Sequence, residues 1–278
     1  MTALLFAVLL SAGEEPDRVV AYKTVETRDL HLEVFLPDGE ATGRPAVLFF
    51  HGGDWKNGTP RQFRPHCRFL ADRGVVAATA EYRLASTDGA KAVDCVADAW
   101  DAVRDLRSRA DELGLDASRV AVGGGSAGGH LAACLGTGTY PPEAGRADDP
   151  PPAAMMLFNP AVCLAPYEAG GVAYEPKGFE RGAGLDRVGC EPAALSPLHH
   201  VDAATPPVVA YHGTADTTAD IASVRLFVRA VEAEPSILHA YDGRGHGFFN
   251  PARAKDGDFE DTLRRTEAFL AALGWIKD

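Results

Sequence analysis

The sequence predicts an α/β protein in which a mostly parallel sheet carries helices on both faces. Short, almost continuously apolar segments alternate along the chain with longer segments in which apolar residues recur every three or four positions. The first pattern is typical of strands buried on both faces, and the second of helices with one face packed on a sheet. The 278 residues are 46% hydrophobic, which is enough for one sizeable core. Because neither an internal repeat nor a second core is visible, we expect a single domain over residues 18–278.

The expected strands begin with a hairpin. Residues 19–24 and 31–35 alternate between apolar and polar, and a turn at Arg28 and Asp29 separates them, which predicts an antiparallel pair at a sheet edge. The buried strands are expected over residues 46–50, 75–80, 120–122, 155–158, 208–211 and 237–241. The helices are expected over residues 63–73, 90–113, 127–136, 220–234 and 258–273. In such a fold, ligands bind beyond the carboxyl ends of the strands.

Three segments fall outside this alternation. Residues 137–152 and 164–204 are rich in Gly and Pro and predict irregular insertions that form a small cap over the strand ends. The apolar run over residues 1–10 is too short to span a bilayer, and the small residues of 11–13 follow it as a cleavage site would. We therefore expect a signal peptide over residues 1–13 and an exported protein, with a cytoplasmic protein as the alternative.

Charge and cysteine content exclude two classes of function. The formal net charge of −12 would repel a phosphate backbone, so nucleic acid is not an expected partner. The five cysteines show neither a CxxC pair nor the Cys/His spacing of a zinc site, so no structural metal is expected. Disulfides between Cys67 and Cys95 and between Cys163 and Cys190 are one interpretation, and buried thiols are the other.

The segment Gly124 to Gly128 (GGSAG) is a G-x-S-x-G motif. It follows an expected strand and opens an expected helix, as a nucleophile on a sharp strand-turn-helix elbow requires. Residues two before and two after such a nucleophile must be small, because side chains there would collide with the neighbouring strand and helix. Ser126 is therefore the candidate nucleophile.

The same stretch also satisfies the dinucleotide motif G-x-G-x-x-G, through Gly123, Gly125 and Gly128. That interpretation needs an acidic residue about 20 positions further on, at the end of a second strand. Glu143 has this spacing but lies in a Pro-containing segment that does not resemble a strand end. The elbow interpretation is therefore preferred.

A serine nucleophile requires a base and an acid that orients the base. In this class of fold they follow the serine in the order Asp or Glu, then His. Asp216 follows the expected strand 208–211, and His246 follows the expected strand 237–241. Because parallel strands end at one edge of the sheet, we expect both side chains to meet Ser126 there.

Acyl transfer also needs donors for the oxyanion, and backbone N–H groups are suited to that task. His51-Gly52-Gly53 comes directly after the expected strand 46–50, where an oxyanion loop of the HGGG kind is found. We expect the N–H groups of Gly52, Gly53 and Ala127 to form the oxyanion hole.

Taken together, these motifs resemble the carboxylesterases of the α/β-hydrolase superfamily, in particular the compact acetyl-xylan and feruloyl esterases related to the hormone-sensitive-lipase group. The resemblance runs from about residue 20 to the end of the chain. It rests on HGGDW (51–55), EYRLA (81–85), GGSAGGHLA (124–132), SPLHH (196–200), HGTAD (212–216) and GRGHGFFN (243–250). It implies an α/β-hydrolase fold, a triad of Ser126, Asp216 and His246, and no cofactor or metal.

Two positions refine this resemblance. Asp54 stands where the HGGG pattern has its third glycine, and its carboxylate would oppose the oxyanion if the side chain turned inward. Trp55 fits the HGG-x-W variant of the compact esterases, and we expect it to contact substrate. Tyr82 and Arg83 are expected to have structural roles at a strand end.

The sequence thus predicts a serine carboxylic-ester hydrolase that acts on short-chain esters, acetyl esters first, through an acyl-enzyme. Acetylated polysaccharide is one candidate substrate. An arylformamidase, a peptidase-type amide hydrolase and a non-catalytic binding module on the same fold stay open as alternatives. We expect a small-molecule or polysaccharide ester as the partner and no stable membrane insertion, and the sequence leaves the oligomeric state open.

Overall fold

The structure is a computed structural model that describes residues 15–26, 28–39, 42–142, 149–178 and 185–276. The expected signal peptide over residues 1–13 and the acidic residue Glu143 lie outside these ranges.

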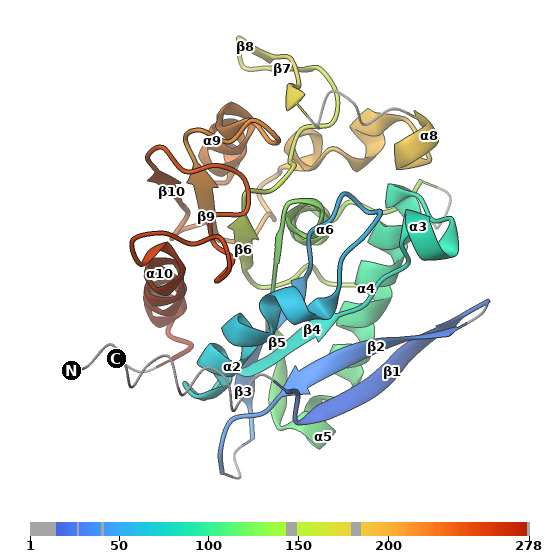
Figure 1. The fold of residues 1–278 in the computed structure, drawn as a ribbon, viewed down its shortest axis with the longest axis vertical. Helices are drawn as coiled ribbons and strands as arrows, with labels where there is room; N and C mark the ends of the chain where they lie inside the picture. Colours follow the sequence, from blue (N-terminus) through green and yellow to red (C-terminus); the bar gives the residue numbers. More distant parts are fainter. Residues whose placement is uncertain (1–14, 27, 40–41, 143–148, 179–184, 277–278) are drawn as a thin grey trace.

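The described residues form an eight-stranded sheet in the order β1-β2-β4-β3-β5-β6-β9-β10 (Figure 1). Its strands are β1 (Arg18–Val25), β2 (Arg28–Phe35), β3 (Arg44–Phe50), β4 (Val76–Ala80), β5 (Leu115–Gly125), β6 (Met155–Phe158), β9 (Val208–Gly213) and β10 (Ile237–Tyr241). Strand β2 is antiparallel to β1 and β4, and the other neighbours are parallel. The predicted mostly parallel sheet with an edge hairpin is confirmed.

The turn of that hairpin was predicted at the wrong residues. Val25 of β1 pairs with Arg28 and Thr24 pairs with Asp29, so Arg28 and Asp29 belong to β2 and do not form the turn. The Arg28 guanidinium donates to both carboxylate oxygens of Asp88 at 3.0 Å each. This bidentate pair holds Arg28 in the strand.

Helices cover both faces of the sheet (Figure 1). One face carries α4 (Ala92–Ser108), α6 (Ala127–Gly136) and α9 (Ile221–Ala230), and the other carries α2 (Arg64–Ala71) and α10 (Asp258–Ala272). Each face has its own apolar cluster, which explains why the central strands are continuously apolar. Short elements complete these layers: η1 (Pro60–Phe63), α3 (Ala85–Asp88) and α5 (Ala110–Leu113).

Of the two interpretations of the cysteines, the disulfides are wrong, and all five cysteines, which lie in the described ranges, are thiols. Cys67 on α2 and Cys95 on α4 belong to the clusters on opposite faces of the sheet, so their sulfurs cannot meet. The thiol of Cys163 donates to the carbonyl of Ala165, and the thiol of Cys190 contacts the carbonyl of Glu191, instead of the two sulfurs joining each other.

The described part of residues 164–204 lies beyond the carboxyl ends of the strands, over α6 (Figure 1). It contains the hairpin β7 (Tyr167–Ala169) and β8 (Val172–Tyr174), followed by α8 (Leu185–Val188), η2 (Pro192–Leu195) and η3 (Pro197–His200). The side chains of Tyr174, Leu195 and Leu198 anchor it in the cluster beneath. The segment expected to be irregular thus has short regular elements, which its composition did not reveal.

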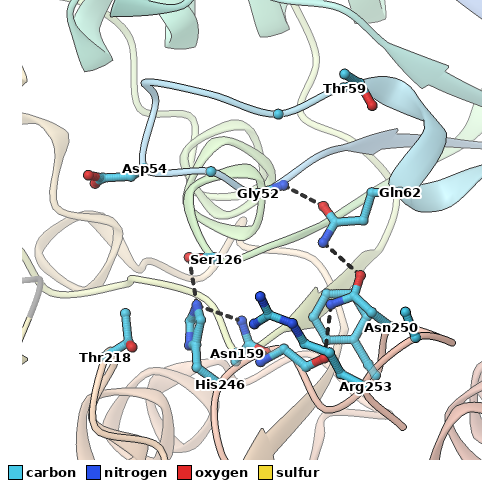
Figure 2. A pocket seen from close by; sticks show the side chains of 15 residues that line it. Gly52, Asp54, Thr59, Gln62, Ser126, Asn159, Thr218, His246, Asn250 and Arg253 are labelled. Atoms are coloured by element: carbon cyan, nitrogen blue, oxygen red, sulfur yellow. Dashed lines mark hydrogen bonds between the residues drawn. The ribbon is translucent and has the colours of Figure 1, made fainter. Parts of the chain in front are cut away.

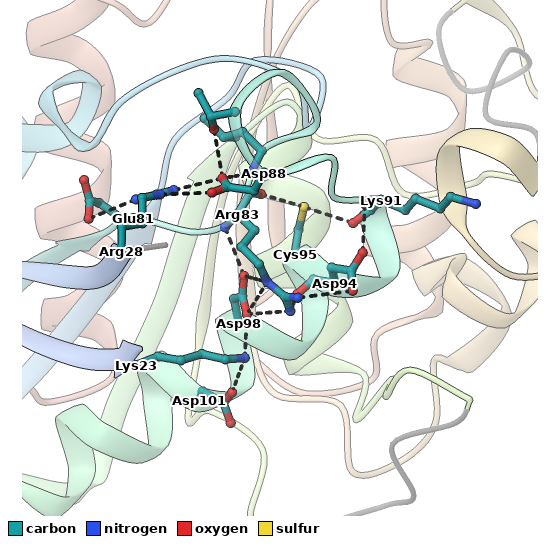
Figure 3. Close-up of polar contacts among 12 residues, drawn as sticks. Lys23, Arg28, Glu81, Arg83, Asp88, Lys91, Asp94, Cys95, Asp98 and Asp101 are labelled. Atoms are coloured by element: carbon teal, nitrogen blue, oxygen red, sulfur yellow. Dashed lines mark hydrogen bonds and ion pairs between the residues drawn. The ribbon is translucent and has the colours of Figure 1, made fainter. Parts of the chain in front are cut away.

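A polar network fixes the end of β4 against α4 (Figure 3). The Arg83 Nε donates to both oxygens of Asp98, whose side chain has no exposed surface. Lys23 of β1 donates to Asp98 at 2.6 Å and to Asp101 at 2.7 Å. The hydroxyl of Tyr82 donates to the carbonyl of His51 at 2.7 Å. Tyr82 and Arg83 therefore have structural roles, and Tyr82 braces the loop that follows β3.

Among the described residues, no helix is both long enough and apolar enough to cross a lipid bilayer.

Candidate active site

Ser126 lies at a sharp turn between β5 and α6. Its φ of 54° is unusual for a residue other than glycine and marks a strained backbone. A methyl group on Gly124 would collide with the backbone carbonyl of Gly128, and one on Gly128 would collide with that of Phe50. The two glycines of the G-x-S-x-G motif are thus required by the close approach of strand and helix, as the sequence predicted.

The structure brings Ser126, His246 and Asp216 together. The His246 Nε2 lies 2.9 Å from the Ser126 Oγ, and the Nδ1 lies 2.7 Å from a carboxylate oxygen of Asp216. The other Asp216 oxygen accepts from the N–H groups of Thr218 and Ala219 at 2.8 and 3.1 Å. Burial by itself raises the pKa of the Asp216 carboxyl, but the His246 contact and these N–H groups outweigh it and bring the pKa below its usual value. Asp216 is thus an ionised acceptor that fixes the imidazole with Nε2 facing the serine.

Asn159 is a further member of this site that the sequence analysis missed. It directly follows β6 and is fully buried, and its Oδ1 accepts from the Gly247 N–H at 3.0 Å. Its Nδ2 lies 3.4 Å from the His246 Nε2 (Figure 2). A polar residue at the end of the buried run 155–158 was the available signal, because Ser126, Asp216 and Asn159 all follow the carboxyl ends of parallel strands.

The loop after β3 approaches the elbow closely. A Cβ on Gly52 would lie 2.9 Å from the Gly125 carbonyl and 3.3 Å from the Ser126 Cβ. The Gly53 φ of 128° is one that residues with a side chain rarely adopt. Ala127 is the first residue of α6, where the N–H has no partner within the helix. Gly53 lines the same cavity as Ser126, and Ala127 follows Ser126 directly in sequence, so the prediction that their N–H groups form the oxyanion hole stays open to test.

Gly52 does not fit the predicted role of an oxyanion donor. Its N–H donates to the Gln62 Oε1 at 2.6 Å and is therefore already used (Figure 2). The Gln62 Nε2 donates in turn to the Asn250 Oδ1 at 2.8 Å, and the Asn250 Nδ2 donates to the Gly247 carbonyl at 2.9 Å. This Gln62 relay, made of Gly52, Gln62, Asn250 and Gly247, joins the loop after β3 to the loop that carries His246.

A cavity of about 660 Å³ opens at Ser126 and His246. The described residues of its lining are mostly glycines and small or polar residues, and Phe249 is the one large apolar side chain among them. Its polar lining includes Asp54, Gln62, Asn250 and Arg253 (Figure 2). Among the described residues, no group of three or more His, Cys, Asp or Glu side chains is arranged to hold a metal ion.

Comparison with known proteins agrees with this geometry. Residues 32–143 match the family described as BD-FAE. The structure of a thermophilic esterase from Thermogutta terrifontis, Est2, is 39% identical to this chain, covers 93% of each chain and superposes with a TM-score of 0.82. The chain belongs to the α/β-hydrolase carboxylesterases.

Two curated relatives of this carboxylesterase family match over shorter stretches. An AB hydrolase superfamily protein of Schizosaccharomyces pombe is 38% identical over 47% of this chain and 37% of its own length. An ethyl acetate hydrolase of Pseudomonas putida is 36% identical over 46% of this chain and 42% of its own length. The chain thus matches less than half the length of these relatives.

The residue at which this carboxylesterase departs from the HGGG pattern, Asp54, is held by an arginine. Asp54 has a φ of 66°, and its carboxylate forms an ion pair with Arg187 of α8. Figure 2 shows the Asp54 side chain directed away from Ser126. The carboxylate does not turn inward toward the oxyanion side of the site.

The prediction that Trp55 contacts substrate is not supported by its position. Its side chain is 1% exposed, and it is absent from the lining of the cavity at Ser126. The indole packs edge-on against the imidazole of His130, with ring centroids 4.9 Å apart. Trp55 therefore packs the loop after β3 onto α6, and its large apolar surface is better buried than exposed to substrate.

Proposed function

We propose that this protein is a serine carboxylesterase whose catalytic triad is Ser126, His246 and Asp216. The observation that carries the proposal is the continuous hydrogen-bonded chain from Asp216 through His246 to the Ser126 hydroxyl, with contacts of 2.7 and 2.9 Å. Both lie within the range that proton transfer between a nucleophile and its base requires.

The reaction follows from this chain in two steps. As the Ser126 Oγ attacks the ester carbonyl, His246 takes the hydroxyl proton and then delivers it to the leaving alcohol. The acyl-enzyme is then hydrolysed: His246 removes a proton from water, the hydroxide attacks the same carbonyl carbon, and the proton passes from His246 to the Ser126 Oγ as the carboxylic acid leaves. Asp216 stabilises the imidazolium in both steps, and the N–H groups of Gly53 and Ala127 stabilise the oxyanion.

Short acyl groups are the proposed substrates, with acetyl esters first. Solved structures of the Thermogutta esterase carry bound propionate and butyrate, and the Pseudomonas relative is an ethyl acetate hydrolase. Among the described residues that line the cavity, Phe249 is the one large apolar side chain, which suits a short acyl group better than a long hydrocarbon chain. Acetylated polysaccharide stays a proposed substrate because its ester groups carry the same short acetyl acyl group.

The test is hydrolysis of p-nitrophenyl esters from acetate to palmitate by the wild type, by Ser126→Ala and by Ser108→Ala. Ser108 lies at the end of α4 and controls for loss of a serine hydroxyl elsewhere. We expect the highest kcat/KM for acetate to butyrate in the wild type and Ser108→Ala, and a loss of at least about 10⁴-fold in kcat for Ser126→Ala. Undiminished turnover in Ser126→Ala would overturn the triad, and a maximum at palmitate would overturn the short-acyl assignment. Hydrolysis of formanilides in place of any ester would favour the amide-hydrolase alternative.

A further inference from the structure

The cavity at Ser126 contains one guanidinium without an acidic partner. Of the described residues that line it, Asp54 and Arg253 carry full formal charges. Asp54 is ion-paired with Arg187 outside the cavity. Within the described part of the chain, the Arg253 guanidinium forms no hydrogen bond and no ion pair, and its side chain is exposed. The cavity therefore presents an available positive charge.

This guanidinium lies beside the catalytic histidine. A Cβ on Gly247, the residue that follows His246, would be 3.1 Å from the Arg253 Nη1 and 3.5 Å from its Cδ. The Asn250 carbonyl accepts from the N–H groups of Arg253 and Ala254 at 2.8 Å each, which fixes the turn from which the side chain extends. Figure 2 shows the Arg253 side chain directed into the cavity on the side of His246.

The acids that are nearest in the sequence are already engaged. Arg244 donates to Asp258 at 2.5 Å and to Asp256 at 2.8 Å. Because Arg244 holds both carboxylates, neither neutralises Arg253. Arg244 is thus paired with acids of its own region, whereas Arg253 faces the cavity at Ser126.

We propose that Arg253 binds a carboxylate of the substrate, so that the preferred substrates are short esters with a carboxylate close to the ester group. The inference rests on the proposed esterase function and deepens it. A guanidinium forms two parallel hydrogen bonds with a carboxylate, and no other side chain has this geometry. In a protein with a net charge of −12, a local cation also offsets the general repulsion of an anionic substrate.

Two ester pairs, each differing by one charge, distinguish where the carboxylate is carried. For a carboxylate on the acyl part, monoethyl succinate is compared with ethyl succinamate. For a carboxylate on the alcohol part, 4-acetoxybenzoate is compared with 4-acetoxybenzamide. The ratio of kcat/KM for the anion to kcat/KM for the amide is measured for the wild type, Arg253→Gln, Arg253→Lys and Arg225→Gln. Arg225 lies exposed on α9, outside the cavity lining, and controls for a change in net charge.

For at least one pair, we expect the ratio to fall about tenfold in Arg253→Gln, as expected for loss of a charge-assisted hydrogen bond. Arg253→Lys should recover part of the ratio, and Arg225→Gln should retain the wild-type value. The wild-type ratio should also decrease as salt is raised. Equal ratios in the wild type and Arg253→Gln for both pairs would overturn this inference alone, provided that the wild type hydrolyses the neutral esters. If it hydrolyses neither neutral ester and Ser126 proves unreactive, the proposed function is overturned and this inference with it.

Discussion

The Gly52 N–H donates to the Gln62 Oε1 at 2.6 Å, and this bond fixes the loop beside Ser126. Gln62 also donates to Asn250, which lies 188 residues further along the chain. These two bonds fix the loop after β3 relative to the loop that carries His246. The Gln62 relay therefore positions the proposed oxyanion donor relative to the proposed base without touching the reacting atoms.

Substitution Gln62→Leu should lower kcat about ten- to hundredfold with little change in KM. Loss of the acceptor frees the Gly52 peptide, and a displacement of about 1 Å at such a site costs about this much. Gln62→Glu keeps an acceptor for Gly52 and should recover part of kcat. Steady-state kinetics with p-nitrophenyl acetate check this, with melting temperatures to separate a catalytic loss from a folding defect. A Gln62→Leu variant with wild-type kcat would show that the relay does not position the donor.

Asn159→Asp should move the acid limb of the pH profile of kcat/KM to higher pH. The carboxylate retains an acceptor for the Gly247 N–H, but it places a negative charge beside the His246 Nε2, which lies 3.4 Å from the native amide. A negative charge there favours the protonated imidazole, which cannot act as base. Asn159→Ala, which adds no charge, is the matched control. An acid limb that stays in place in Asn159→Asp would argue against this proximity.

Asp216→Asn should reduce kcat by about 10⁴-fold, as expected when the orienting carboxylate of a triad is lost. The lowered pKa of Asp216 also gives a stability effect with a defined sign. Folding lowers the pKa of this carboxyl from its value of 3.8 in the unfolded chain. Such a carboxyl stabilises the folded state at pH values above 3.8, and this contribution is lost as the pH falls below that value. The difference in melting temperature between the wild type and Asp216→Asn should therefore not shrink between pH 7 and about pH 5, and it should shrink below about pH 4. A difference that shrinks between pH 7 and pH 5 would contradict the lowered pKa.

His66→Leu should make the protein more resistant to acid. His66 lies fully buried among aromatic rings, and burial lowers its pKa from 6.5 to about 3. Below pH 6.5 the unfolded chain binds a proton that the folded protein does not, so stability falls as the pH decreases toward 3. Between pH 6 and pH 4, the free energy of unfolding of the wild type should fall by up to about 1.4 kcal/mol per pH unit more than that of His66→Leu. Parallel curves in urea titrations would show that His66 does not cause the difference.

The sequence predicted the parts of the fold and site that depend on local pattern. Strand β6 and helix α6 have the predicted bounds, because continuous apolar runs and helical periodicity mark elements that are buried all round. Strand β10 also has the predicted bounds, but it was expected to be buried and is instead a partly exposed edge strand. Ser126, Asp216 and His246 were found because each follows a recognisable strand end. Local patterns say nothing about side-chain partners that are distant in sequence, so the roles of Gln62 and Asn159 were missed.

The wrong predictions have the same origin. Gly52 was assigned as a donor because its motif lies beside the elbow, but the structure gives its N–H to a glutamine ten residues further on. Trp55 was assigned to the substrate because of its place in a motif, whereas packing on His130 buries it. In each case a tertiary contact decided the role of the residue.

The central claim is that one serine, activated by His246, carries the acyl group. The most direct test is to label the protein with a fluorophosphonate, locate the label by peptide mass spectrometry and follow acetate-ester hydrolysis in parallel. The account predicts one label per chain on Ser126, with activity lost in proportion to labelling, and slow labelling in His246→Asn. Activity that persists after Ser126 is fully labelled, or a label on another residue that accounts for the loss, would contradict it.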